Sequence, residues 1–412
     1  MADIKPFRGI RPAQGLADQI AALPYDVYNR EEAREEALSH PLSFLNIDRP
    51  EVHFPPQQDM FAPEVYRKAH DLLWEMVEKG EFVQDETPCY YLYELTMNGR
   101  SQTGIVACAS IDDYQTGVIK KHENTRAQME QDRICHVDTC NAQTGPIFLA
   151  YRKDPCLQAA VSRAKETSPL FDFTTEDGVT HRGWIIRDQR DIEGIEEAFQ
   201  NIDRIYIADG HHRAASAVKV GLKRRAAHPD YDGTEEFNYF LSVLFPDEEL
   251  MIMDYNRVVR DLNGLTTEQF LEAVGEKCQI FPLKNASSPE QKGQVSMYLE
   301  GRWYLLKFKP EYLSEDPVEG LDVSALQREI LAPILNIRDP KQDERIDFVG
   351  GIRGLRELER LADGDWAVAF AMYPTSIGEL FAVADRGELM PPKSTWFEPK
   401  LRSGLFIHEL GR

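Results

Sequence analysis

The chain has 412 residues, of which 42% are hydrophobic and 28% are charged, so it can bury a substantial core and lacks the composition of a disordered protein. Its formal net charge is −22, because 69 acidic residues outnumber 47 basic ones. Affinity for nucleic acids and for anionic membranes comes from lysine and arginine surfaces, so we expect neither as a partner.

Export and membrane signals are also missing from the sequence. The first residues are polar and interrupted by prolines, unlike a secretory signal peptide, and no apolar run approaches the length of a membrane span. The six cysteines form no Cys-x-x-Cys pair, which is typical of reduced thiols. Cys135, His136 and Cys140 could form half of a zinc site, but no second pair completes it. We therefore expect a cytoplasmic protein.

The N-terminal part predicts a turn, a strand and a helix. Pro24 holds the residue before it extended, so Asp26 should lie on a rigid turn. Asp26 would either cap the helix expected from about residue 30 or bind a metal or a substrate amine. The apolar run at 42–47 predicts a strand, and the spacing of apolar residues at 63–79 predicts an amphipathic helix.

A hairpin and a group of polar residues follow. Strands are expected at 89–97 and 102–111, joined by Asn98-Gly99, a dipeptide typical of a type I′ turn. A polar helix is expected at 126–140. Directly before it lie an ammonium, an imidazole, a carboxylate and a hydroxyl group, which belong to Lys121, His122, Glu123 and Thr125. Asn124 or Thr125 could simply cap that helix. Because a cap needs only one such side chain, we favour a functional role for the group.

The main candidate site follows the apolar run at 205–208, which predicts a buried strand. Asp209 and Gly210 end the strand, and small alanine-rich sequence after them predicts a helix at 213–220. A strand, a glycine turn and a helix together point backbone N–H groups at one spot, which favours an anion such as phosphate. Arg213 in the first helical turn could clamp it with its planar guanidinium. The alternative is that Asp209 merely caps the helix and that His211 and His212 are surface residues.

Beyond residue 264 the sequence changes in character, and we place a domain boundary between 1–262 and 263–412. The second region predicts helices and strands in mixed order, namely a helix at 267–277, a hairpin at 294–299 and 302–309, a helix at 323–335, a strand at 366–372 and a helix at 377–386. Residues 390–400 contain three prolines and predict no regular structure. They are either a tail that closes the core or a functional loop in which Lys393 and Lys400 bind a phosphate or a carboxylate.

Four stretches together resemble a known family, namely Pro24-Tyr25-Asp26-Val27, Lys121-His122-Glu123-Asn124-Thr125, Ala208 to Arg213, and Met390-Pro391-Pro392-Lys393-Ser394-Thr395-Trp396-Phe397. They are similar to domain of unknown function 1015, a large prokaryotic family sometimes labelled serine-kinase-like. Asp209-Gly210-His211-His212-Arg213 also resembles the Asp-Gly-His-x-Arg loop of archaeal free-serine kinases. At Asn256 relatives tend to have histidine, so Asn256 cannot do acid–base work here.

The resemblance implies an α+β fold, with a ParB/sulfiredoxin-like, nucleotide-binding core at 1–262 and a C-terminal α+β region packed on it. It implies a nucleotide-dependent phosphotransferase that uses ATP or ADP and Mg²⁺ and acts on a small hydroxylated metabolite, most simply free L-serine. Two further functions stay open: a non-catalytic nucleotide-binding regulator, and a metal-dependent hydrolase with His211 and His212 as ligands. The hydrolase is disfavoured because adjacent helical residues point about 100° apart.

The expected roles of the site residues follow from that chemistry. Phosphates would be held by a group of backbone amides and side chains, namely Gly210, His211, His212 and Arg213. Lys121 or Lys393 would offset charge on the transferring group. Either Asp209 or Asp26 would bind Mg²⁺ through hard oxygen ligands. Asp209 is also expected to be catalytic, together with Glu123 and His122. Glu123 or His122 would act as the base for the acceptor hydroxyl.

Overall fold

The computed structural model describes residues 1–411, which fold into two compact units. The first unit comprises Met1–Leu250 and the chain from Pro399 onward, and the second is Met251–Glu398. Each unit mixes helices with a β-sheet, so the predicted α+β class is confirmed. The units divide at residues 251 and 399 rather than at 262, because the chain returns to the first unit after completing the second.

The first unit is built on a nine-stranded mixed sheet in the order β6-β11-β8-β12-β5-β4-β10-β9, with β1 paired to β5. Its strands are β1 (Ile4–Lys5), β4 (Tyr90–Met97), β5 (Arg100–Ser110), β6 (Ile119–Lys120), β8 (Ile147–Tyr151), β9 (Phe171–Thr174), β10 (Thr180–Ile186), β11 (Ile205–Asp209) and β12 (Tyr239–Pro246). The predicted hairpin is confirmed, since β4 and β5 pair in antiparallel register around Asn98 and Gly99, which both have positive φ. Two pairs are parallel: β6 with β11, and β8 with β12.

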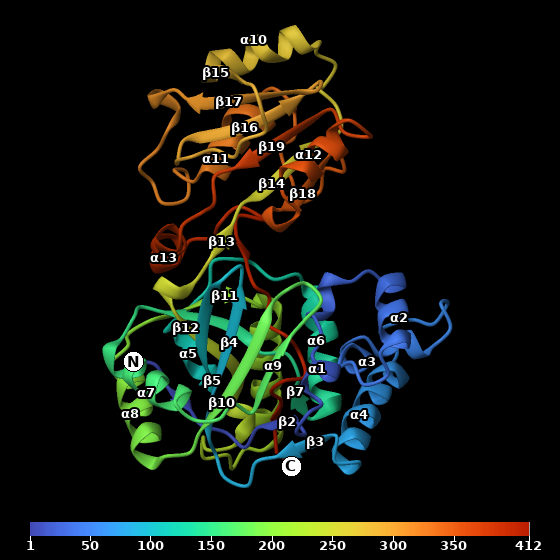
Figure 1. Ribbon diagram of the computed structural model, residues 1–412, viewed down its shortest axis with the longest axis vertical. Coiled ribbons are helices and arrows are strands. Elements are labelled where there is room, and N and C mark those ends of the chain that lie inside the picture. The colour runs from blue at the N-terminus through green and yellow to red at the C-terminus, as the bar shows by residue number, and fades with distance from the viewer. Residues whose placement is uncertain (412) are drawn as a thin grey trace. The chain divides into compact units, whose positions relative to one another are not determined.

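Helices surround this sheet (Figure 1). They are α1 (Ala17–Ile20), α2 (Arg30–Ser39), α3 (Leu45–Asp48), α4 (Pro63–Glu78), α5 (Ile111–Thr116), α6 (Ala127–Cys140), α7 (Pro155–Lys165), α8 (Gln189–Gln200) and α9 (His211–Ala227). Helix α6 packs against both α9 and α4, and α2, α3 and α4 enclose a second hydrophobic cluster. The predicted strand at 42–47 is wrong, because this run enters α3. A short apolar run fits a buried helix as well as a strand, and here Leu45 and Ile47 are both fully buried.

The main core lies between the sheet and the helices that cover it. Leu149, Ile205 and Ile207 on neighbouring strands have no exposed surface, and they pack with Ala214 and Val218 of α9. Burial of the first four residues of β11, Ile205 to Ala208, explains why they are apolar. Within residues 1–411 no helix combines the length and apolar character needed to cross a bilayer.

The second unit contains a six-stranded antiparallel sheet in the order β15-β17-β16-β19-β14-β18. Its strands are β14 (Tyr255–Val259), β15 (Cys278–Leu283), β16 (Gln294–Leu299), β17 (Arg302–Phe308), β18 (Ile346–Gly350) and β19 (Val368–Met372), beside a two-stranded ribbon of β13 (Ile252–Met253) and β20 (Trp396–Phe397). The helices are α10 (Thr267–Lys277), α11 (Asp322–Leu326), α12 (Leu355–Ala362) and α13 (Ile377–Asp385). The predicted hairpin at 294–309 is confirmed, whereas the predicted helix at 323–335 is shorter, because a π-helical turn at Gln327–Leu331 follows α11.

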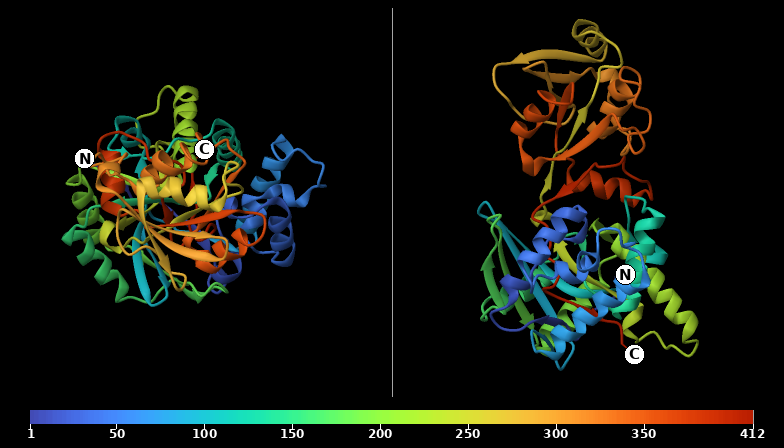
Figure 2. Two further views of the ribbon diagram at one scale, coloured as in Figure 1. Left: turned by 90° about the horizontal axis from the view of Figure 1, so that it is seen from above. Right: turned by 90° about the vertical axis from the view of Figure 1, so that its right-hand side faces the viewer.

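The chain from Pro399 runs through the interior of the first unit (Figure 2, right). Its short strand β21 (His408–Glu409) pairs with β7 (Ala142–Gln143). Leu405 and Ile407 have no exposed surface, and Ile407 forms a β-bridge with Ile10 near the N-terminus. This C-terminal segment is therefore part of the core of the first unit.

Candidate functional site

The parallel pairing of β6 with β11 brings two sequence-predicted stretches to one edge of the sheet. Ile119 pairs with Ile205, and Lys120 pairs with Tyr206. The loop at 121–125 leaves β6, and the turn at Gly210 leaves β11, in the same direction. The polar group that begins at Lys121 therefore lies beside the start of α9.

A β-bulge shapes the end of β11. The register of β11 against β8 shifts between Ile207 and Asp209, which leaves Ala208 unpaired in the ladder. Bulges bend a strand and re-aim its side chains. Gly210 then adopts a left-handed conformation, with φ 92° and ψ 32°, and forms the N-cap of α9. Because only glycine takes this conformation readily, the chain passes directly from strand to helix, and α9 begins at His211 rather than at Arg213.

Arg213 folds back over this turn. Its Nη1 donates a hydrogen bond to the carbonyl of Pro146 at 2.6 Å, and its Nη2 donates to Oδ2 of Asp209 at 3.3 Å. A Cβ atom at Gly210 would lie 3.1 Å from two guanidinium nitrogens of Arg213. The bare backbone of Gly210 thus leaves the space that the guanidinium occupies.

Asp209 carries a negative charge between cations. Besides Arg213, Lys400 of the C-terminal segment places its Nζ 3.9 Å from Oδ2 of Asp209. Burial raises the pKa of Asp209, but Lys400, Arg213 and His211 outweigh it and hold the pKa at about 2. The carboxylate is therefore ionised at neutral pH, and its side chain keeps 39% of its surface exposed.

His122 and His211 form a buried, neutral pair. Their rings meet edge to face with centroids 4.5 Å apart, and the residues are 3% and 5% exposed. Burial lowers the pKa of His122 to about 4. Burial, together with His122, lowers the pKa of His211 well below its usual range. Neither ring is charged at neutral pH.

The contacts of His211 select one tautomer. The backbone N–H of His122 donates to Nε2 of His211 at 3.5 Å, so Nε2 is the acceptor and the ring proton lies on Nδ1. That Nδ1 lies 3.8 Å from Oε2 of Glu123, whose side chain is 44% exposed. His211 therefore directs an N–H toward a carboxylate that reaches solvent.

His212 links the starts of two helices. Its Nε2 accepts the backbone N–H of Arg126 at 3.0 Å, and Arg126 is the N-cap of α6. Neither Asn124 nor Thr125 caps α6, so the alternative of a simple cap is wrong; the Thr125 hydroxyl donates instead to Glu130. Because His211 and His212 contact different partners, they do not converge on one point. Within residues 1–411 no cluster of three histidine, cysteine or acidic side chains is arranged to hold a metal ion.

Three further sequence-predicted residues are Asp26, Lys121 and Lys393, of which Lys121 lies close enough for its charge to help lower the pKa of His211. Asp26 is exposed on a 3₁₀ turn (Tyr25–Val27), and Asn29 caps α2, so the expected capping role of Asp26 is wrong. Lys121 is exposed, with Nζ 5.5 Å from the ring centroid of Tyr114. Lys393 belongs to the second unit.

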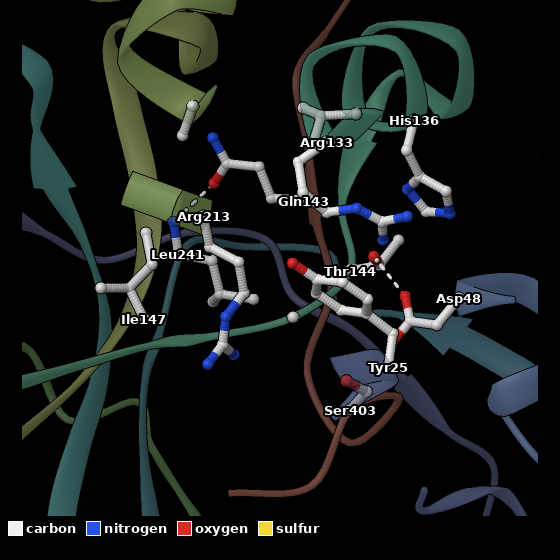
Figure 3. A pocket seen from close by; sticks show the side chains of 13 residues that line it. Tyr25, Asp48, Arg133, His136, Gln143, Thr144, Ile147, Arg213, Leu241 and Ser403 are labelled. Carbon is white, nitrogen blue, oxygen red and sulfur yellow. Dashed lines mark hydrogen bonds between the residues drawn. The ribbon is translucent and has the colours of Figure 1, made fainter. Parts of the chain in front are cut away.

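A small cavity of about 30 Å³, lined by both polar and apolar residues, lies against Arg213, with room for about two waters (Figure 3). Arg133, 7% exposed, places its guanidinium 4.0 Å from the ring centroid of Tyr25, and Thr144 donates to Asp48 at 3.0 Å. Ser403 of the C-terminal segment completes the wall. Sequence reasoning did not identify these residues. The one available signal was the polar sequence predicted to form a helix at 126–140. In the structure this helix, α6, is buried along the face that carries Arg133.

Comparison with known proteins gives a family model and several solved structures. The model described as "Protein of unknown function (DUF1015)" matches residues 4–324, and no curated protein matches the sequence. A free serine kinase in complex with AMP is 15% identical over 71% of this chain and 86% of that chain, with a TM-score of 0.35. A conserved hypothetical protein from Pyrococcus furiosus is 15% identical over 73% and 93%, with a TM-score of 0.34. SbnI with C-terminal truncation from Staphylococcus aureus is 12% identical over 71% and 82%, with a TM-score of 0.38.

Proposed function

This chain belongs to the DUF1015 family, described as proteins of unknown function, and from the chemistry of its site we propose that it is a nucleotide-dependent phosphotransferase. The donor is ATP or ADP, and the acceptor is a small hydroxylated metabolite, most simply free L-serine. The main support is the pairing of β6 with β11, which sets the glycine-capped start of α9 beside the solvent-reaching carboxylate of Glu123.

Phosphoryl transfer depends on positioning and charge neutralisation more than on covalent help from the protein. The first turn of α9 offers the positive end of a helix dipole to a phosphate, beside the Arg213 guanidinium that lies against Gly210. Arg213 is held by Pro146, so its planar fork is already oriented. Lys400 and Lys121 add positive charge around the loop.

The carboxylates fit a magnesium ion that arrives with a nucleotide. Nucleotide-bound Mg²⁺ is usually held by one or two carboxylates together with the phosphates, so a dedicated cluster of protein ligands is not required. Asp209 is ionised and partly exposed, and the exposed Asp26 is the second candidate. The metal would neutralise charge on the phosphates.

We assign the base that accepts the proton of the substrate hydroxyl to Glu123 rather than to His122. His122 is 3% exposed and faces the ring of His211, so it is enclosed by protein. Glu123 reaches solvent, and its Oε2 lies 3.8 Å from Nδ1 of His211, close enough for the ring to orient the carboxylate electrostatically. His122 then supports the ring that orients the base.

Nucleotide affinity of an Arg213 series tests the phosphate role. Arg213→Ala removes charge-assisted hydrogen bonds worth roughly 1.5–3 kcal/mol, so nucleotide affinity should fall about 10- to 200-fold in isothermal titration calorimetry. Arg213→Lys should recover only part, because an ammonium cannot reproduce a bidentate contact. Suppose instead that Arg213→Ala lowers the melting temperature while the folded protein binds nucleotide normally. Arg213 would then have only a structural role, through its hydrogen bonds to Pro146 and Asp209, and the proposed phosphate contact would be wrong.

A Glu123 variant separates the enzyme from a nucleotide-binding regulator. Glu123→Gln should abolish most turnover of ATP or ADP with serine while leaving nucleotide affinity intact, since a base acts on the acceptor. Suppose that the wild-type protein binds nucleotide but phosphorylates neither serine nor a related hydroxylated metabolite. That result would support the alternative function, a non-catalytic nucleotide-binding regulator. A melting temperature that responds to no nucleotide would remove both functions, because a ligand at 100 times its Kd adds about 2.7 kcal/mol of stability.

A further inference from the structure

Two motifs from distant parts of the sequence meet inside the second unit. Arg257 on β14 donates through Nη2 to the carbonyl of Lys393 at 3.0 Å. One residue further, the carbonyl of Ser394 accepts the hydroxyl of Thr375 at 3.0 Å. The loop that carries Lys393 is thus fastened to the sheet of this unit directly over Arg257.

Arg257 is a buried cation without an acidic partner. It is 3% exposed, and its hydrogen-bond acceptors among residues 1–411 are two backbone carbonyls, those of Tyr255 and Lys393. Its guanidinium carbon lies 5.4 Å from the ring centroid of Phe348. Carbonyl oxygens and an aromatic face supply only partial negative charge, whereas a buried full charge is costly unless it is paired.

Other arginines of the same unit show the usual arrangement. Arg345 contacts Asp343 at 2.8 Å, and Arg328 contacts Glu319 at 2.7 Å. Both are more exposed than Arg257, yet each has a carboxylate. Burial lowers the pKa of Arg257 to about 10, as expected for a guanidinium that lacks one, and it stays protonated at neutral pH.

Lys393 adds a second positive charge on the loop above Arg257. Its side chain is exposed, and its Nζ lies 5.5 Å from the ring centroid of Tyr255, which stands beside Arg257 in β14. Lys393 also has a φ of 56°, an uncommon conformation for a residue with a side chain. The backbone thus holds Lys393 in a costly conformation at the place where its carbonyl covers the buried guanidinium.

We propose that Arg257 and Lys393 form an oxyanion-binding site within the second unit. Its ligand is the phosphate or carboxylate group of a small molecule, which supplies the negative charge that the protein does not place against Arg257. The guanidinium provides directional hydrogen bonds, and the lysine adds a second positive charge at the surface. This site is separate from the loop at Asp209–Arg213 and does not depend on the phosphotransferase activity.

Titration of the full-length protein with inorganic phosphate, and in a second arm with acetate, tests the site. The measurements are made in an Arg213→Ala background, which removes the phosphate contact proposed for the first unit. Added Arg257→Gln should weaken oxyanion binding about 10- to 100-fold, and Lys393→Gln about 3- to 10-fold. Arg260→Gln is the matched control, because Arg260 lies just after β14 with its guanidinium 4.6 Å from the ring centroid of Trp366. It should leave binding unchanged.

The outcomes separate this proposal from the proposed function. Equal oxyanion affinity in the Arg213→Ala protein with and without Lys393→Gln and Arg257→Gln would overturn the site. Lys393→Gln changes an exposed side chain, so it decides the question if Arg257→Gln does not fold, as checked by circular dichroism. Tighter binding of phosphate than of acetate identifies a phosphate site, and the reverse identifies a carboxylate site. Failure of Arg213→Ala to affect nucleotide binding would contradict only the phosphotransferase.

Discussion

Two opposed electrostatic effects determine the protonation state of Asp209. Partial burial alone would favour the protonated acid, while Lys400 and Arg213 favour the carboxylate at 3.9 Å and 3.3 Å. The cations prevail, since the pKa falls to about 2. Asp209 is therefore an anion held by the fold, available as a hard oxygen ligand.

The shifted pKa of Asp209 predicts a specific acid sensitivity. A group with a folded pKa of about 2 and an unfolded pKa of about 3.9 adds stability above pH 5, and that stability is lost as the pH falls through this window. Asp209→Asn should therefore show a shallower loss of stability between pH 5 and pH 2 than the wild type. Urea denaturation across this range measures it. Asp26→Asn, which neutralises an exposed carboxyl of the same unit, should keep the wild-type slope; identical slopes in all three proteins would contradict the account.

His211 predicts a rescue pattern that only an orienting residue would show. An asparagine amide can place an N–H near the position of Nδ1, whereas a glutamine amide reaches the position of Nε2. His211→Asn should therefore reduce kcat for serine phosphorylation by less than about 10-fold, and His211→Gln by about 100-fold, with the KM for nucleotide little changed in both. Steady-state kinetics provides the test. Equal losses in the two variants, or a loss confined to KM, would show that the Nδ1–H does not orient Glu123.

At the scale of elements, the site depends on one strand-to-helix junction. The bulge in β11 turns Asp209 out of the ladder, and the left-handed Gly210 starts α9 without an intervening loop. The same glycine leaves the space into which Arg213 folds. The end of β11, the turn at Gly210 and the side chain of Arg213 thus form a single local structure.

Two glycines with similar backbone angles separate strain from site disruption. Gly210 has φ 92° beside Arg213, and Gly178 has φ 79° with no atom within 4 Å of an added Cβ. Alanine at either position should cost about 1–2 kcal/mol of stability for the left-handed backbone. Only Gly210→Ala should also displace Arg213 and weaken nucleotide binding, by about 10-fold or more. Unchanged nucleotide affinity in a folded Gly210→Ala protein would argue against the clamp.

Local patterns in the sequence were sufficient for the junction itself. The apolar run at 205–208 with Asp209 and Gly210 after it predicts strand, turn and helix, and the structure has all three. The hairpin at Asn98-Gly99 follows from turn chemistry in the same way. The run at 42–47 misled because a buried one-turn helix and a buried strand share the same apolar composition.

Long-range pairing was beyond these patterns. Nothing in the periodicity near Lys120 indicates that it pairs with Tyr206, yet this pairing places Glu123 against His211. The approach of Lys400 to Asp209 likewise requires the path of the C-terminal segment. The cavity beside Arg213 also went unpredicted, because its wall combines residues that are far apart in the sequence, among them Asp48 of α3, Arg133 of α6 and Ser403 of the C-terminal segment.

At the scale of the molecule, the C-terminal segment completes the first unit. Phe406 is 1% exposed and contacts the rings of Tyr91 and Tyr93 on β4 and of Phe171 on β9. The same segment supplies Lys400 to the candidate site and Ser403 to the cavity beside Arg213. Stability and site geometry thus depend on the same short stretch.

Phe406→Ala should destabilise the protein by about 3–5 kcal/mol, the usual cost of emptying a buried aromatic site. Phe281→Ala is the control, because Phe281 is 44% exposed on β15 and should cost well under 1 kcal/mol. Urea denaturation followed by circular dichroism measures both. Similar small losses for the two variants would mean that the C-terminal segment lies loosely on the first unit.

The return of the chain at Pro399 also sets an order of events during synthesis. The second unit is encoded between two parts of the first, so the ribosome must make all of Met251–Glu398 before Lys400 emerges. At about 5–20 residues per second this delay lasts roughly 7–30 s. Throughout it, the nascent first unit has its sheet strands but not the segment that fills its core and approaches Asp209. A nascent chain therefore acquires the complete site only after the second unit has been translated.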